Sequence, residues 1–297
     1  MNTAMSEYVS VRASETLDQG DLVAFLKTRF PQITKPIGRA VGEGTECVEV
    51  RVPSMSSEFE EIKQFIGARR LQGLHGYADF AIGHYLRKYT KAQLRQAEIL
   101  RLNIDAHFEP SGEECGTIYE TVCKECNLGR QISDLILDVR RVPQHKDISE
   151  TIAWVEWIVS PTFARVFAEN ELRGVEFKPI VEFKNPTKQS PVWSQLCVTG
   201  RAGKLSESTR LGKDPFSPSH VSWRCPLGHS VVAQFLSETY LDRNGWDGSD
   251  IAVTSDLFGQ GQNLLRSTRL ILISQRTYRA IEGAGLKGFS VEVAHLA

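Results

Sequence analysis

The residues with the clearest chemical potential are Cys123 and Cys126, which stand two residues apart in the stretch ETVCKECNLGR. This spacing places two thiolates on the same side of a metal ion, and a structural zinc ion takes four such ligands. Six cysteines in 297 residues, behind an N-terminus without the features of an export signal, favour free thiols or metal ligands over a disulfide framework. The spacing therefore predicts one half of a zinc site.

The stretch WRCPLGH, roughly a hundred residues later, supplies the other predicted half through Cys225 and His229. Gly228 occupies the place of a second cysteine, but an imidazole reaches further than a thiolate and zinc accepts either donor. The predicted ligands of a closed, structural zinc ion are therefore Cys123, Cys126, Cys225 and His229. Two alternatives stay open: Cys115 as the fourth ligand, or three cysteines and a water molecule, which would make the site catalytic.

An enzyme of the nucleoside or base deaminase type is the main alternative function. His107 and Glu109 match an H-x-E motif, and Cys123 and Cys126 match the C-x-x-C motif that follows it in zinc deaminases. In those enzymes a helix and a strand separate the two motifs. Here only about a dozen residues do so, and they begin with a Pro-Ser-Gly turn that interrupts a helix. The spacing therefore favours a structural or surface role for His107.

Two segments, 158–177 and 272–291, describe the same structural unit. Each has an apolar strand that ends in a serine suited to an N-cap, then a helix of about ten residues, then Leu-basic-Gly and a second apolar strand. The glycine suits a left-handed helix C-cap. The equivalent positions are Ser160 and Ser274, Leu172 and Leu286, and Gly174 and Gly288.

Further matches upstream extend this internal repeat. The stretch SDLIL at 133–137 corresponds to SDIAV at 249–253, and a cysteine motif precedes each of them. The alternating run ILRLNIDAHF at 99–108 predicts a strand in front of the first cysteine region. The sequence thus predicts two related strand-helix-strand lobes, at about 99–200 and 201–297, bridged by the zinc-knuckle-like site.

The first part of the chain predicts a separate small α+β unit over residues 1–75. It has strands at 8–13 and 46–53, a helix at 18–30, and a second helix that opens at Ser57. The duplicated, zinc-bridged domain then spans 76–297, and the fold class of the whole chain is α+β.

The overall charge balance weakens a nucleic-acid-binding function, which is a second alternative. The formal net charge is −1, whereas such proteins usually carry a basic face. The basic clusters at 67–70 and 85–91 alternate with acidic residues and are expected on solvated helix faces. No apolar run reaches the length of a membrane span, so the expected location is the cytosol.

Two cysteine-containing knuckles with neighbouring L-(K/R)-G units give this sequence a family resemblance over about 99–297. It resembles the double-CXXCG proteins of myxobacteria and other bacteria, which are regarded as immunity proteins of toxin–immunity pairs. The second motif departs from the family pattern because it lacks its second cysteine. The resemblance implies a non-catalytic binding protein whose partner is a cognate protein toxin, and it leaves the oligomeric state open.

Overall fold

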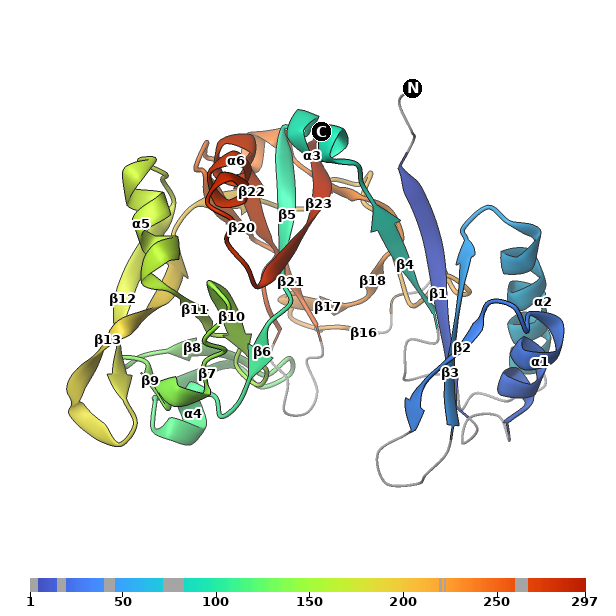
Figure 1. The fold of residues 1–297 in the computed structure, drawn as a ribbon, viewed down its shortest axis with the longest axis horizontal. Coiled ribbons are helices and arrows are strands. Elements are labelled where there is room, and N and C mark those ends of the chain that lie inside the picture. Colours follow the sequence, from blue (N-terminus) through green and yellow to red (C-terminus); the bar gives the residue numbers. More distant parts are fainter. Residues whose placement is uncertain are drawn as a thin grey trace. The chain divides into compact units, whose positions relative to one another are not determined.

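The computed structural model describes residues 5–14, 20–39, 46–71, 83–218, 221, 223–259 and 267–297. They form two compact units, coloured along the sequence in Figure 1. The first unit comprises Met1–Thr90, Arg210–Ser222 and Ala233–Ser237, and the second comprises Lys91–Thr209, Trp223–Val232 and Glu238–Ala297. Both units contain helices and strands, in agreement with the predicted α+β class.

The first unit is a four-stranded antiparallel sheet with two helices on one face (Figure 1). Its order along the chain is strand-helix-strand-strand-helix-strand, and its strands lie in the order β2-β3-β1-β4. This is the split βαβ arrangement of ferredoxin-like folds. The elements are β1 Ser6–Ser14, α1 Asp21–Arg29, β2 Thr34–Arg39, β3 Glu46–Pro53, α2 Ser57–Leu71 and β4 Gly83–Lys88, with a short hairpin of β15 Leu211–Gly212 and β18 Gln234–Phe235.

Hydrophobic periodicity explains how the helices cover this sheet. Phe59, Ile62 and Ile66 of α2 are buried against alternate residues of β1 and β3, as their helical spacing predicts. The cap of α2 differs from the prediction by one residue. The hydroxyl of Ser56, and not that of Ser57, accepts the backbone amide of Phe59 at 3.2 Å. The predicted start of the first helix at residue 18 lies outside the described residues.

The end of the first unit differs from the prediction. Residue 75, the predicted boundary, lies outside the described residues, but β4 follows it and pairs with β1. The cluster at 85–91, expected on a helix face, belongs mainly to this strand. The side chain of Arg87 is only 3% exposed and pairs with Glu7 at 2.8 Å. A strand is favoured here because the edge of β1 otherwise leaves backbone groups unpaired.

The second unit contains two six-stranded sheets and two principal helices. Its elements are α3 Lys91–Gln96, β5 Ile99–Ile104, β6 His107–Phe108, α4 Gly112–Cys115, β7 Tyr119–Cys123, β8 Leu128–Gln131, β9 Ile136–Leu137, η3 Val139–Arg141, β10 Ile148–Thr151, β11 Trp157–Val159, α5 Pro161–Glu169, β12 Val175–Glu182, β13 Asn185–Val198, β14 Arg201–Gly203, β16 Trp223–Arg224, β17 Ser230–Val232, β19 Thr239–Leu241, η4 Arg243–Gly245, β20 Ile251–Thr254, β21 Leu257–Phe258, β22 Ile271–Ser274, α6 Gln275–Gly283 and β23 Phe289–Leu296.

The two large sheets have the same succession of strand directions. One has the order β6-β10-β11-β13-β12-β9, and the other has the order β14-β20-β22-β5-β23-β19. In both, the outermost pairs are parallel and the three inner pairs are antiparallel. The sheets match position by position, with one peculiarity. β5 comes directly before the strands of the first sheet in the chain but lies in the second sheet. In the same way, β13 comes directly before the strands of the second sheet but lies in the first.

The segments 158–177 and 272–291 share their secondary structure and their caps. The hydroxyl of Ser160 accepts the backbone amide of Phe163, and the hydroxyl of Ser274 accepts that of Thr277, each at 3.1 Å. The two serines therefore cap α5 and α6. Leu172 and Leu286 are both buried, at 8% and 9% exposure. After each helix, a glycine has positive φ: 101° at Gly174 and 110° at Gly288. Local sequence and local geometry therefore agree closely in these two segments.

Two aspartates tie the equivalent segments together in a reciprocal way. Asp147 accepts the hydroxyl of Ser160 at 2.8 Å and the amide of Lys287 at 2.9 Å. Asp250 accepts the hydroxyl of Ser274 at 3.0 Å and, with its other oxygen, the amide of Arg173 at 3.0 Å. Each carboxylate thus supports the helix cap of one sheet and the Leu-basic-Gly turn of the other.

This pairing corrects one of the predicted matches. Residues 133–137 contribute β9, an edge strand beside β12, whereas 249–253 contribute β20 between β14 and β22. The segment that corresponds structurally to 249–252 is 146–149, because Asp147 and Asp250 make equivalent bonds. The Ser-Asp pair that the two segments share led to the wrong match, because this pair occurs in turns of many kinds.

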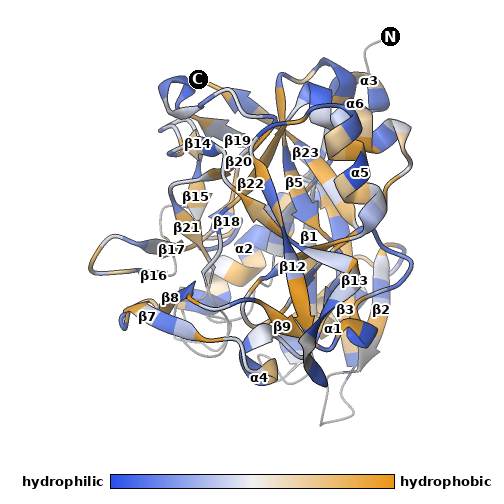
Figure 2. Cartoon of the chain, turned by 90° about the vertical axis from the view of Figure 1, so that its left-hand side faces the viewer, coloured by the Kyte–Doolittle hydropathy of each residue, from blue (hydrophilic) through white to orange (hydrophobic). Residues whose placement is uncertain are grey.

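A single core joins the two sheets and the helices α5 and α6. Buried residues of both sheets, with Phe163 and Phe167 from α5 and Tyr278 and Ile281 from α6, form one hydrophobic cluster. Figure 2 shows hydrophobic residues among hydrophilic ones along these elements. The predicted run 99–108 is interrupted at Asp105, whose amide binds the carbonyl of Gly288 at 2.9 Å. Its two parts, β5 and β6, therefore enter different sheets.

Candidate metal centre

Two hairpin tips carry the four predicted ligands, and both lie within the second unit. β7 and β8 pair in antiparallel fashion and hold Cys123 and Cys126 at their turn. β16 and β17 pair in the same way and hold Cys225 and His229. The turns suit their residues, because Asn127 has a φ of 55° and Gly228 a φ of 78°, a conformation that asparagine and glycine adopt more readily than other residues.

The four donor atoms lie within 4.8 Å of one another, at distances that fit a tetrahedral ion. The sulfur atoms of Cys123 and Cys225 are 3.9 Å apart, and the Nδ1 atom of His229 lies 3.8 Å from Cys126 and 3.9 Å from Cys225. Metal–sulfur bonds of about 2.3 Å at tetrahedral angles separate two sulfurs by about 3.8 Å. A disulfide requires a much shorter separation. The group can therefore hold a metal ion.

The surroundings of the thiols favour metal binding. Cys123, Cys126 and Cys225 are at most 4% exposed and pack with Leu128 and Trp223. Burial by itself raises the pKa of the Cys225 thiol, but hydrogen bonds outweigh it, and the pKa falls to about 7. These bonds come first from the backbone amides of His229 and Leu227 and then from the thiols of Cys126 and Cys123. Amides that point at a sulfur stabilise the thiolate, which is the form that binds a metal.

Ser230 is a member of this site that the sequence analysis missed. Its side chain is buried, and its hydroxyl lies beside Cys126. Burial raises the pKa of Cys126, and the Ser230 hydroxyl acts against that rise. A thiolate at Cys126 would accept a hydrogen bond from this hydroxyl, which otherwise has no partner among the described residues. The only available signal in the sequence was its position directly after His229.

The alternative ligands and the deaminase residues lie elsewhere. Cys115 is buried in α4 and does not belong to the four-donor group. His107 is half exposed, with its Nδ1 atom 3.3 Å from Glu150, and Glu109 accepts the amide of Ala153 at 3.0 Å. The described residues therefore place His229, and not His107 or Cys115, beside the three thiols.

No protein-family model matches the chain, and no curated protein matches its sequence. The resemblance to double-CXXCG proteins thus remains a prediction from its motifs. In the described part of the chain, no helix is both long and apolar enough to cross a membrane.

Proposed function

We propose that the chain binds one zinc ion through Cys123, Cys126, Cys225 and His229, and that this ion is structural. The observation that carries the proposal is the group of four donors within 4.8 Å, three of them buried thiols. Thiolates and imidazole in a tetrahedral arrangement select zinc over the harder magnesium and calcium ions. Four protein donors fill the coordination sphere, so no site is left for a reactive water molecule.

The ion would join corresponding hairpins of two related halves. The first hairpin, β7–β8, lies between β6 and β9 in the chain, and the second, β16–β17, lies between β14 and β19. These strands occupy equivalent places in the two matching sheets. We therefore propose that the second unit arose by duplication, with β5 and β13 exchanged between the halves, and that the ion fastens the halves together.

For the biological role, we propose a non-catalytic binding protein that neutralises a cognate protein toxin in the cytosol. The support is the motif resemblance to immunity proteins, together with a metal group whose four donors come from the protein. A rigid scaffold suits such a role, since a preorganised surface loses less conformational entropy on binding.

The geometry gives less support to the two alternatives. A deaminase needs a histidine and two cysteines on the ion, but His107 pairs with Glu150 instead. In the basic cluster at 67–70, Arg70 lies 2.7 Å from Asp214, and Arg69 pairs with Asp21. Paired guanidinium groups contribute little to nucleic-acid binding because their charge is already balanced.

Metal analysis tests the structural proposal. Protein purified without chelator should contain about one zinc per chain, as expected for a high-affinity site of four ligands. Cys225→Ser should lower this content strongly, while the matched variant Cys47→Ser, in the first unit, should retain it. Less than about half an equivalent of zinc in the unaltered protein would contradict the proposal.

Co-expression tests the biological role. The product of the adjacent gene should inhibit growth of a sensitive host, and this protein should relieve the inhibition. Relief should persist with Cys47→Ser and decline with Cys225→Ser. If the neighbour is harmless alone, or remains toxic despite this protein, the immunity function is wrong, whatever the result for zinc.

A further inference from the structure

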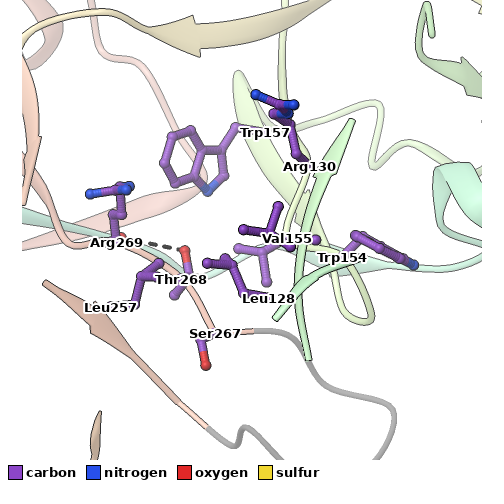
Figure 3. A pocket seen from close by; sticks show the side chains of 11 residues that line it. Leu128, Arg130, Trp154, Val155, Trp157, Leu257, Ser267, Thr268 and Arg269 are labelled. Carbon is purple, nitrogen blue, oxygen red and sulfur yellow. Dashed lines mark hydrogen bonds between the residues drawn. The ribbon is translucent and has the colours of Figure 1, made fainter. Parts of the chain in front are cut away.

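A cavity of about 430 Å³ lies within the second unit, and Figure 3 shows the side chains that line it. This volume is in the range of small-molecule sites. Its wall consists of the β7–β8 hairpin, the start of β11 with the loop before it, β21, and the segment that leads to β22. The lining residues are Val122, Leu128, Gly129, Arg130, Trp154, Val155, Trp157, Leu257, Ser267, Thr268 and Arg269.

Two indole rings form fixed parts of this wall. Trp157 donates its Nε1 hydrogen to Glu150 at 3.2 Å. Trp154 stacks on Tyr119 with ring centroids 3.7 Å apart and donates to Glu113 at 2.6 Å. A Cβ atom on Gly129 would lie 2.4 Å from the Trp154 ring, so the strand must have glycine there. Rings that are held before a ligand arrives bind it with little loss of entropy.

The loop between these indoles is strained. Val155, which lines the cavity, has a φ of 58°. A β-branched residue rarely has a positive φ, and such strain is concentrated at sites of function. The amide of Val155 donates to Thr151 at 3.2 Å, and that of Thr151 donates to Glu156 at 3.1 Å, so the turn is closed by its own hydrogen bonds.

Arg269 provides a fixed positive charge at the cavity. Its Nη1 atom donates to the carbonyls of Thr254 and Ser255, at 2.6 and 2.8 Å, which leaves the guanidinium charge without an anionic partner. Among the described residues, no carboxylate lies within ion-pair distance of it. The buried hydroxyl of Ser267 also lacks a hydrogen-bond partner within the described part of the chain. An anionic oxygen would pair with the guanidinium group.

We propose that this cavity binds a flat aromatic ring that carries a carboxylate. The Trp157 indole and Leu128 offer apolar contact to the ring, and Arg269 offers charge-assisted hydrogen bonds to the carboxylate. The proposal goes beyond a structural zinc site, because it gives the region around the ion a ligand of its own.

The cavity wall is continuous with the metal centre. Leu128 lines the cavity and packs against the three cysteines. Leu257 lines it from β21, where it pairs with Ser230, the residue after the ligand His229. The ion therefore holds two sides of the cavity in position, and this coupling, unlike the cavity itself, rests on the proposed metal site.

Calorimetric titration of the full-length protein with 2-naphthoate tests the proposal. A ligand of this size should bind with a Kd of about 1 mM or tighter. Arg269→Gln and the uncharged probe 2-naphthamide should each weaken binding at least about tenfold, because both remove the ion pair. Arg279→Gln, an exposed arginine of α6 that does not line the cavity, is the matched control and should leave the Kd unchanged. Melting temperature and zinc content show whether each variant is folded.

Each outcome decides a separate point. Absence of naphthoate binding, equal binding of naphthamide, or equal loss in Arg279→Gln would overturn the ligand assignment. Chelator-treated protein should bind naphthoate more weakly; an unchanged Kd would refute the coupling. If the protein contains no zinc but shows Arg269-dependent binding, the metal site is wrong and the ligand site stands.

Discussion

Replacement of Gly288 by alanine should destabilise the second unit, for a reason that is visible in the backbone. A Cβ atom at this position would lie 2.1 Å from the carbonyl oxygen of Ile148, in a residue whose φ is 110°. The neighbouring carbonyl of Lys287 accepts the amides of Asp147 and Ile148, at 2.7 and 3.2 Å. The substitution therefore acts on the contact that joins the two large sheets.

The expected magnitude combines two effects. The unfavourable φ costs about 1 to 3 kcal/mol, and the oxygen of Ile148 must retreat by roughly 1 Å, which weakens hydrogen bonds worth about 1 kcal/mol each. The sum is about 3 to 5 kcal/mol, a large part of the stability of a typical domain. For a unit of this size, the melting temperature should fall by roughly 10 °C.

Urea and thermal unfolding measure this loss, and Gly285→Ala is the matched control. Gly285 has a φ of 66°, but no atom lies within 4 Å of the position that a Cβ atom would take there. It should therefore lose only the conformational term, about 1 kcal/mol. Gly174→Ala should behave like Gly288→Ala, because its Cβ would lie 2.1 Å from the carbonyl of Ile251. Equal losses at Gly285 and Gly288 would refute the argument from close approach.

Two further substitutions test the metal centre and a buried carboxyl group. Cys225→Ser should lower the free energy of unfolding of the whole second unit by about 3 to 5 kcal/mol, because the proposed ion would close a loop of about a hundred residues. A loss that amide hydrogen exchange confines to the hairpin would contradict this. Burial raises the pKa of Glu150 from 4.5 to about 7, so the folded state retains a proton that the unfolded chain releases, and stability should fall as the pH rises from about 4.5 to beyond 7. Glu150→Gln should remove this decline and be more stable at pH 8 by about 1 to 3 kcal/mol; the same pH dependence in both proteins would show that another group is responsible.

The local features of the sequence carried most of the correct predictions. The caps at Ser160 and Ser274 and the left-handed glycines after the helices depend on interactions among near neighbours. The buried set at 99–108 followed from alternation alone, since every second side chain of a strand shares a face. The grouping of Cys225 with Cys123 followed from one assumption, that the two cysteine motifs occupy equivalent positions in the internal repeat.

Long-range partnership outside the matched cysteine motifs was beyond the same reasoning. No local feature of the sequence indicates that β5 pairs with β22 and β23 instead of the strands that follow it. None indicates that Ser230 lies beside Cys126 either. The match of 133–137 to 249–253 failed because letter similarity does not distinguish an edge strand from an inner one. Asp147, which holds two sheets, stands among residues with no motif.

The exchanged position of β5 has a consequence for how the chain is made. The strand is synthesised well before its two neighbours, β22 and β23, which end at residues 274 and 296. Contacts across about 170 residues are slow to form, because closure of a long loop precedes any gain from pairing. Until β22 and β23 have been synthesised, both edges of β5 lack their final partners, and Leu100 and Leu102 lack neighbouring strands to pack with. Folding of this sheet therefore waits for the synthesis of β23, and removal of β23 would expose an aggregation-prone edge.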